Sequence, residues 1–160
     1  CIPGDFYIDP IYPVNNALIT HSHTDHARPG NKKILGTLDT INIMKLRYGK
    51  NYCQYSQKIE YGKLLKIRGV NIKFIPAGHI LGSSQIYLEY KGEIVVVSGD
   101  YKRRKDLTCD LFEVSKCHTF ITEATFGLPI FSHPNDINET SKLIKSINGN
   151  SEYCLSLIHI

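Results

Sequence analysis

The chain has 160 residues, of which 42% are hydrophobic and 21% are charged, and its formal net charge is +4. This composition suits one hydrophobic core and excludes a disordered, collagen-like or strongly basic nucleic-acid-coating protein. No apolar run approaches the ~20 residues that span a bilayer, and the first residues lack a signal-peptide pattern. We therefore expect a cytoplasmic protein with no membrane segment.

The five cysteines include no C-x-x-C pair, and their odd number argues against a disulfide framework. We expect reduced thiols that lie mostly in the core. The chain begins at Cys1 and ends on an apolar run that starts at Cys154. We interpret it as a piece of a longer protein.

In the first third of the chain, short buried strands are predicted at residues 6–8 and 17–20, each bounded by turn-forming residues. Residues 33–36 can form another strand. Asp39 is a candidate N-cap for the helix that follows. The apolar residues of that helix are Ile41, Ile43, Met44 and Leu46.

Four apolar segments separated by glycines predict a meandering antiparallel sheet. They are residues 64–67, 70–75, 85–90 and 93–97. Beyond them the pattern predicts a buried strand at 119–122, a helix at about 137–147 closed by Asn148-Gly149, and a strand at 153–160. Strands with helices outside them indicate a layered α/β fold.

The most informative motif is the hexapeptide His21-Ser22-His23-Thr24-Asp25-His26, which follows a predicted strand. In an extended segment, residues two apart point the same way, so His21 and His23 can converge on one ion. If a helix follows, Asp25 and His26 turn to the other side and can hold a second ion. Such donors without thiolates suit Zn²⁺, Mn²⁺ or Fe in a catalytic centre, so the motif predicts a dinuclear hydrolase. The alternative is a chance cluster of solvated side chains.

Two more candidate ligands stand in glycine-rich turns after predicted strands. His79 lies in Ala-Gly-His-Ile-Leu-Gly-Ser and is a candidate third imidazole, although alone it would fit a turn cap better. Asp100 lies in Val-Ser-Gly-Asp-Tyr and is a candidate bridge between two cations, although alone it would be an ordinary turn residue. Together with the hexapeptide, both residues predict one metal centre.

These motifs resemble, in order and context, the metal-site motifs of the metallo-β-lactamase fold. The resemblance is closer to the β-CASP nuclease branch, and closest to the bacterial ligase-associated DNA-damage-response exonucleases. The segments that carry it are GDFYIDP (4–10), HARPG (26–30), PAGHILGS (76–83), SGDYK (98–102) and TEATFGLP (122–129). The resemblance implies a partial αββα sandwich at residues 1–127, incomplete at its N-terminus, and the beginning of a β-CASP cap domain at 128–160.

The resemblance also implies roles for particular residues. Asp9 would orient a ligand imidazole from outside the ligand set. Asp25 would orient the nucleophile as well as bind metal, and Glu123, the acidic residue of the first β-CASP motif, would be catalytic; its alternative is an ordinary strand terminus. The implied ligands are His21, His23 and His79 for the first ion, Asp25 and His26 for the second, and Asp100 for both.

The implied activity is phosphodiester hydrolysis by water that two divalent cations, Zn²⁺ or Mn²⁺, activate. A DNA exonuclease of DNA repair is favoured, with DNA a better candidate substrate than RNA; association with a ligase or helicase rests on the family alone. The alternatives are an RNA-processing nuclease of the same branch, a small-molecule metallo-hydrolase, and a metal-holding fragment without activity.

Two features limit this assignment. The run Lys102-Arg103-Arg104-Lys105 is a candidate contact for the phosphate backbone, with a solvated loop as an equal alternative. The β-CASP proteins supply a later histidine for the second ion, and His118, His133 and His159 stand in no matching context. We therefore expect this chain alone to bind the first ion better than the second and to be nearly inactive.

Overall fold

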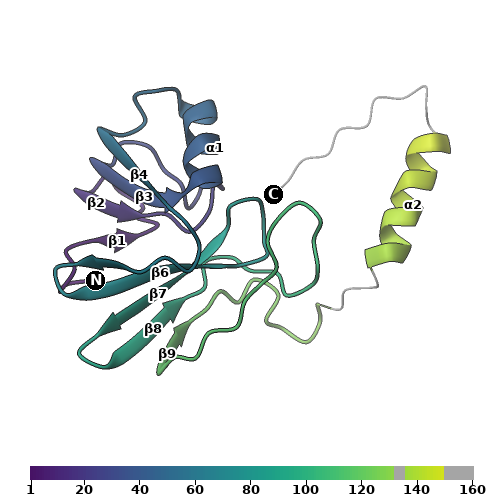
Figure 1. Cartoon of the computed structure of the whole chain (residues 1–160). Helices are drawn as coiled ribbons and strands as arrows, with labels where there is room; N and C mark the ends of the chain where they lie inside the picture. The colour runs from purple at the N-terminus through teal and green to yellow at the C-terminus, as the bar shows by residue number, and fades with distance from the viewer. Residues whose placement is uncertain (132–135, 150–160) are drawn as a thin grey trace. The chain divides into compact units, whose positions relative to one another are not determined.

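The computed structural model describes residues 1–131 and 136–149. It divides into two compact units, Cys1–Glu123 and Ala124–Ile160. Figure 1 shows two sheets in the first unit and helix α2 (Asp136–Gly149) in the second. The predicted domain boundary after residue 127 stays a prediction, and the strand predicted at residues 153–160 lies outside the described residues.

The first sheet has four parallel strands in the order β1-β2-β3-β4. They are β1 (Tyr7–Ile8), β2 (Asn16–Leu18), β3 (Lys33–Thr37) and β4 (Tyr55–Ile59). The strands predicted near β1, β2 and β3 are confirmed. Strand β4 was not predicted, because Ile59 is its single buried residue and its other side chains face water in part or in full.

Helix α1 (Leu38–Tyr48) connects β3 to β4, as a parallel pair requires. The prediction that Asp39 caps this helix is wrong. Thr37 is the N-cap, and its hydroxyl accepts the N–H of Thr40 at 3.4 Å. Asp39 lies instead in the first turn, where its negative charge complements the N-terminal end of the helix dipole.

The second sheet has the order β5-β6-β7-β8-β9. Strands β5 to β8 pair antiparallel, which confirms the predicted meander, and β9 pairs parallel to β8. The strands are β5 (Leu65–Ile67), β6 (Val70–Pro76), β7 (Ser84–Tyr90), β8 (Glu93–Val97) and β9 (Thr119–Ile121).

The main core lies between the two sheets. Leu18 and Leu35 of the first sheet pack in one cluster with Phe74 and Ile86 of the second, and Phe74 and Ile86 are fully buried. Because successive side chains of a strand point to opposite faces, the residues next to these lie on the outer faces of the sheets. The layered α/β class predicted from the sequence is therefore confirmed as two packed sheets.

The outer face of the first sheet is covered by α1. Ile41 and Met44 of the helix pack with Ala17, Ile19 and Ile34 in a second buried cluster. A smaller cluster of Ile75, Tyr87 and Val96 lies on the outer face of the second sheet.

Two burial predictions are wrong. The strand predicted at 119–122 exists as β9, but its residues are exposed, because β9 is the edge strand of its sheet. Among the cysteines that the structure describes, Cys1 is exposed and Cys53, Cys109 and Cys117 are only partly buried, although all four are free thiols as expected. In residues 1–131 and 136–149, neither helix is long and apolar enough to cross a bilayer.

Candidate metal centre

Five polar residues singled out in the sequence each follow the end of a strand by one to three positions. Asp9 follows β1, His21 follows β2, His79 follows β6, Asp100 follows β8 and Glu123 follows β9. Strands β6 and β8 run in the same direction, as do β1 and β2 within their sheet. The topology therefore brings four of these loops to one end of the sheet sandwich, where His21 lies in one group with His79 and Asp100 and in a second group with Asp9.

The hexapeptide begins three residues after β2 ends and then turns. The N–H groups of His26 and Ala27 both donate to the carbonyl of His23, at 3.1 and 2.7 Å. The helix on which the placement of Asp25 and His26 was predicted does not follow, since residues 24–26 form a turn and residue 27 a bend. The turn nevertheless carries His26 back beside His21, with ring centroids 4.2 Å apart.

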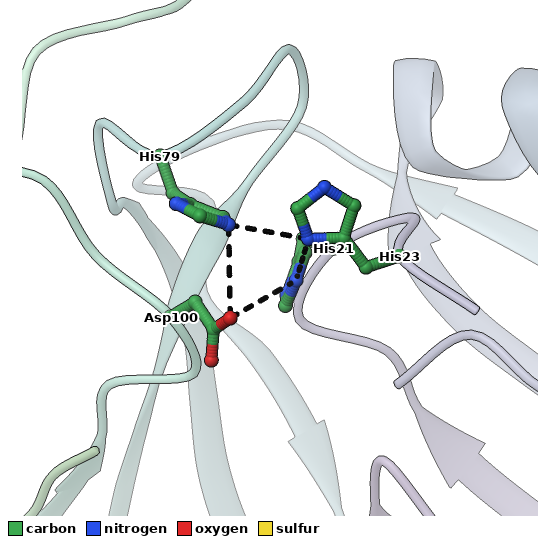
Figure 2. A group of neighbouring side chains, drawn as sticks. All are labelled: His21, His23, His79 and Asp100. Atoms are coloured by element: carbon green, nitrogen blue, oxygen red, sulfur yellow. Dashed lines mark hydrogen bonds and ion pairs between the residues drawn. The ribbon is translucent and has the colours of Figure 1, made fainter. Parts of the chain in front are cut away.

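Three imidazoles and one carboxylate converge at the centre of the site (Figure 2). They are His21, His23, His79 and Asp100, and one donor atom from each lies within 4.8 Å of all the others. His21 is fully buried, and the other three are partly buried. A mixed set of nitrogen and oxygen donors with partial access to solvent is the chemistry of a catalytic divalent-cation site.

The distances within this group match a common ion. His23 Nδ1 lies 3.0 Å from His21 Nε2 and 3.2 Å from His79 Nε2. Donors placed about 2.0–2.1 Å from a Zn²⁺ ion at tetrahedral angles are about 3.3 Å from one another. The two His23 contacts are close to this spacing, and Asp100 Oδ2 lies somewhat farther away, at 3.8 Å from His21 Nε2 and 3.7 Å from His79 Nε2. The four residues together could hold one cation.

A second group shares His21 and consists of Asp9, His21 and His26. The Nδ1–H of His26 donates to Asp9 Oδ2 at 2.9 Å, which leaves Nε2 of His26 directed toward Asp100 Oδ1 at 3.3 Å. Asp25 Oδ2 lies 3.6 Å from the same Nε2 atom, and its side chain is 70% exposed. Asp25 therefore lies at the open rim of the site.

Burial and charge set opposite protonation tendencies for two of the imidazoles. Burial, with the neighbouring charges of His26, His23 and His79, lowers the pKa of His21 to about 2, so this ring is neutral at physiological pH. Burial also acts to lower the pKa of His26, but the hydrogen bond and charge of Asp9, with Asp100 and Asp25, outweigh it and raise that pKa. The neutral His21 ring has the lone pair that a metal ligand needs.

The loop that carries His79 is held by its own serine and by a glycine. The hydroxyl of Ser83 accepts the N–H groups of His79 and Ile80, at 3.0 and 3.2 Å. Gly78 has φ +73°, and a Cβ atom there would lie 2.2 Å from the carbonyl oxygen of Lys102. Only glycine fits this close approach between the His79 loop and the chain after Asp100.

The remaining predicted residues lie beside this centre. Glu123 Oε1 accepts the N–H of Tyr101 at 3.0 Å, so its carboxylate holds the loop that follows Asp100. Lys102 pairs with Asp106 at 3.0 Å, whereas Arg103, Arg104 and Lys105 are exposed. His118 accepts the N–H of Ile94 at 2.9 Å, which holds it beside the beginning of β8. His133 and His159 lie outside the described residues.

Sequence reasoning missed two residues that support the hexapeptide. The Thr20 hydroxyl contacts both Asp9 and His21, and the Arg47 guanidinium of α1 donates to the Ser22 carbonyl. Thr20 directly precedes His21, which was its one visible signal in the sequence. Arg47 gave no local signal, because its partner is 25 residues away.

No family model matches the chain. A probable DNA ligase of Opitutus terrae is 26% identical over 132 residues, which cover 81% of this chain and 13% of that protein. An RNase J-like protein of Methanocaldococcus jannaschii is 29% identical over 161 residues, which cover 87% of this chain and 38% of that protein. The endoribonuclease ysh1 of Aspergillus fumigatus is 29% identical over 96 residues, which cover 58% of this chain and 11% of that protein.

With the two-sheet fold and the His/Asp cluster, these similarities show that the chain is related to the β-CASP nucleases of the metallo-β-lactamase fold. The relationship predicted from the motifs is confirmed. Two of these relatives carry the names of nucleases, which are hydrolases. The chain spans less than two fifths of the length of each of the three relatives.

Proposed function

We propose that this chain provides the metal centre of a nuclease that hydrolyses phosphodiester bonds with two divalent cations, Zn²⁺ or Mn²⁺. The observation that carries the proposal is the position of Asp100. Its Oδ2 atom faces His21 and His79 at 3.8 and 3.7 Å, while Oδ1 faces His26 at 3.3 Å. One carboxylate thus serves two sets of imidazoles, which suits a bridging ligand.

The ligand division that we propose is the one that the resemblance implies. His21, His23 and His79 would hold the first cation, Asp25 and His26 would hold the second, and Asp100 would contact both. The first set is compact and largely shielded, whereas Asp25 is mostly exposed. We therefore expect the first cation to bind more tightly than the second.

Bound divalent cations supply Lewis-acid chemistry, which lowers the pKa of water and neutralises charge on phosphate oxygens. The chain's own side chains would orient the water and the ligands. Asp25, at the open rim, would accept a hydrogen bond from the attacking water and so orient it. Glu123 holds the Tyr101 N–H and thereby steadies Asp100; its catalytic role stays a prediction.

The choice between DNA and RNA as the substrate rests on other observations. A DNA exonuclease of repair, associated with a ligase or helicase, is supported by the residues around Asp9, His79 and Glu123 and by similarity to a protein named as a DNA ligase over 81% of the chain. An RNA-processing nuclease is supported by similarity to an RNase J-like protein over 87% of the chain and to an endoribonuclease. Because two of the three relatives carry ribonuclease names, RNA is the substrate to test first.

The decisive assay uses the protein purified from its natural coding sequence, with whatever that sequence adds at either end. It is incubated with end-labelled single-stranded RNA, DNA of matched sequence, and a lactam, each with Zn²⁺ or Mn²⁺. We expect cleavage of at least one nucleic acid and abolition by EDTA. Hydrolysis of the lactam alone would contradict the proposal. Cleavage of RNA but not DNA would exclude the repair exonuclease.

Ladder patterns from substrates labelled at either end then distinguish the mode of attack. Stepwise loss from one end is expected of an exonuclease, whereas internal fragments at early times are expected of an endonuclease. A His79→Ala variant is the control for a contaminating nuclease, because it removes one proposed ligand of the tighter cation.

A further inference from the structure

We propose that Thr20 is a positioning residue that fixes the tautomer of His21 and ties the two metal positions to one carboxylate, Asp9. The inference rests on the proposed metal centre and adds a residue to it. Thr20 lies between the end of β2 and the first imidazole, and it is fully buried.

The first step is the hydrogen-bonding capacity of the Thr20 hydroxyl. Its oxygen lies 2.5 Å from Asp9 Oδ2 and 3.0 Å from His21 Nδ1. A hydroxyl has one hydrogen, and a carboxylate can only accept. The Thr20 hydrogen therefore points to Asp9, and the contact with His21 is made by the Nδ1–H of the imidazole. This leaves Nε2 of His21 as the lone-pair atom that faces His23 and Asp100.

The second step is that the same Asp9 oxygen serves the other metal position. Oδ2 of Asp9 accepts the Nδ1–H of His26 at 2.9 Å, so His26 also presents its Nε2 atom to the site. Asp9 Oδ1 accepts the backbone N–H of Thr20 at 2.8 Å, which fixes the carboxylate. Asp9 thus orients His26 directly and His21 through Thr20.

The third step is that Thr20 also contacts the loops of the remaining ligands. Its carbonyl accepts both the N–H and the hydroxyl of Ser84, each at 2.8 Å, at the start of the strand that follows the His79 loop. A Cβ atom at Gly99 would lie 2.8 Å from the Thr20 Cβ and Oγ1 atoms, so the chain before Asp100 packs directly on this side chain. Every loop that contributes a ligand to the first cation is therefore in contact with Thr20 or adjacent to it.

The chemistry of the hydroxyl predicts which substitutions matter. Valine has nearly the shape of threonine but cannot accept from His21 or donate to Asp9, so Thr20→Val leaves a buried N–H without an acceptor. Serine keeps the hydroxyl and loses only the methyl group. Loss of an outer partner of a ligating histidine typically weakens metal binding by about 10- to 100-fold. We expect that loss for Thr20→Val and a change of less than about 10-fold for Thr20→Ser.

The experiment compares wild type, Thr20→Val and Thr20→Ser in two readouts. Calorimetric titration of the metal-free protein with Zn²⁺ gives the affinity of the tighter position. Long-range ¹H–¹⁵N spectra of the metal-free protein report which nitrogen of His21 carries the proton. Ile72→Val, a change in the buried core between the sheets, is the control for a general loss of stability.

We expect the Nδ1–H tautomer in wild type and Thr20→Ser, a mixture of tautomers in Thr20→Val, and wild-type Zn²⁺ affinity in Ile72→Val. The inference is overturned if Thr20→Val keeps both the tautomer and the affinity, or if Ile72→Val loses affinity equally. Should the wild-type protein bind no metal, the proposed function fails, and the His21 spectra of the metal-free proteins still decide whether Thr20 sets the tautomer.

Discussion

Asp100 and His26 approach each other at the edge of the ligand cluster, where Asp100 Oδ1 lies 3.3 Å from His26 Nε2. The other carboxylate oxygen of Asp100 faces His21 at 3.8 Å. Because the two oxygens serve separate imidazoles, a change at Asp100 acts on both proposed cation positions. A change at His26 acts on one.

The first prediction is that Asp100→Asn binds fewer cations than the wild-type protein. Asparagine keeps the shape of the side chain, but its amide nitrogen cannot act as a ligand and the negative charge is lost. We expect the weaker cation to be absent and the tighter one to bind at least about 100-fold more weakly, the upper end of the loss caused by removing an outer partner. Elemental analysis after gel filtration and calorimetric titration measure both effects.

Two further variants calibrate that measurement. His26→Ala should lose only the weaker cation, and Asp110→Asn, an exposed carboxylate outside the cluster, should behave as wild type. Unchanged binding of two cations by Asp100→Asn would refute the bridging role.

The candidate ligands could be predicted from the sequence because each one is part of a local pattern. His21 and His23 stand two apart after an apolar run, and Asp100 follows an apolar strand within a glycine turn. The supporting contacts could not be predicted in the same way. Thr20 and Asp9 are 11 residues apart, and they meet only because β1 and β2 pair in parallel with Ile8 opposite Leu18.

The prediction of strands also depends on how much of the signal is local in the sequence. Strands β6 and β7 were predicted because their buried residues alternate or run together. Strands β4 and β9 lie at sheet edges, where few side chains are covered. The sequence of β4 therefore has no apolar pattern, and the apolar residues of β9, expected to be buried, are exposed. Burial at an edge depends on neighbours from elsewhere in the chain, which a local pattern does not contain.

The second prediction compares two glycines with similar backbones. Gly78 has φ +73° and Gly92 has φ +85°, so alanine is strained by about 1–2 kcal/mol at either position. At Gly78 the added Cβ would also lie 2.2 Å from the Lys102 carbonyl oxygen, whereas nothing lies within 4 Å at Gly92. Gly78→Ala should therefore lower the free energy of unfolding by more than Gly92→Ala does.

Urea unfolding of both variants measures the difference, and Zn²⁺ titration measures its effect on the site. Only Gly78→Ala should weaken metal binding, because it displaces the loop that carries His79. Equal loss of stability in the two variants would contradict the proposed close approach.

The third prediction concerns pH and Asp106. The hydroxyl and the N–H of Thr108, and then the Lys102 ammonium, lower the pKa of Asp106 from 3.8 to about 2. A carboxyl group with a lower pKa in the folded chain stabilises the fold above its unfolded pKa and loses that contribution as pH falls through the folded value. Asp106→Asn should therefore be less stable than wild type above pH 4, with the difference shrinking toward pH 2.

Urea unfolding at a series of pH values between 2 and 6 measures this convergence. Histidine protonation changes the stability of both proteins alike, so the difference between the two curves isolates Asp106. Parallel curves over the whole range would contradict the lowered pKa, because the stability difference would then not depend on the charge of Asp106.

The fourth prediction concerns residues 102–105, which are either a contact for the phosphate backbone or a solvated loop. The Lys102 ammonium is 3.0 Å from the Asp106 carboxylate, so a phosphate would have to compete for it, whereas Arg103, Arg104 and Lys105 are exposed. For single strands, each lost phosphate contact reduces the slope of log K against log salt by about 0.7. Replacing the three exposed residues by glutamine should therefore reduce the slope by up to about 2, and Lys102→Gln should reduce it by less than about 0.7.

Fluorescence anisotropy with labelled single-stranded RNA and DNA, without added metal, measures the slopes. A slope that the triple variant leaves unchanged would assign the run to a solvated loop.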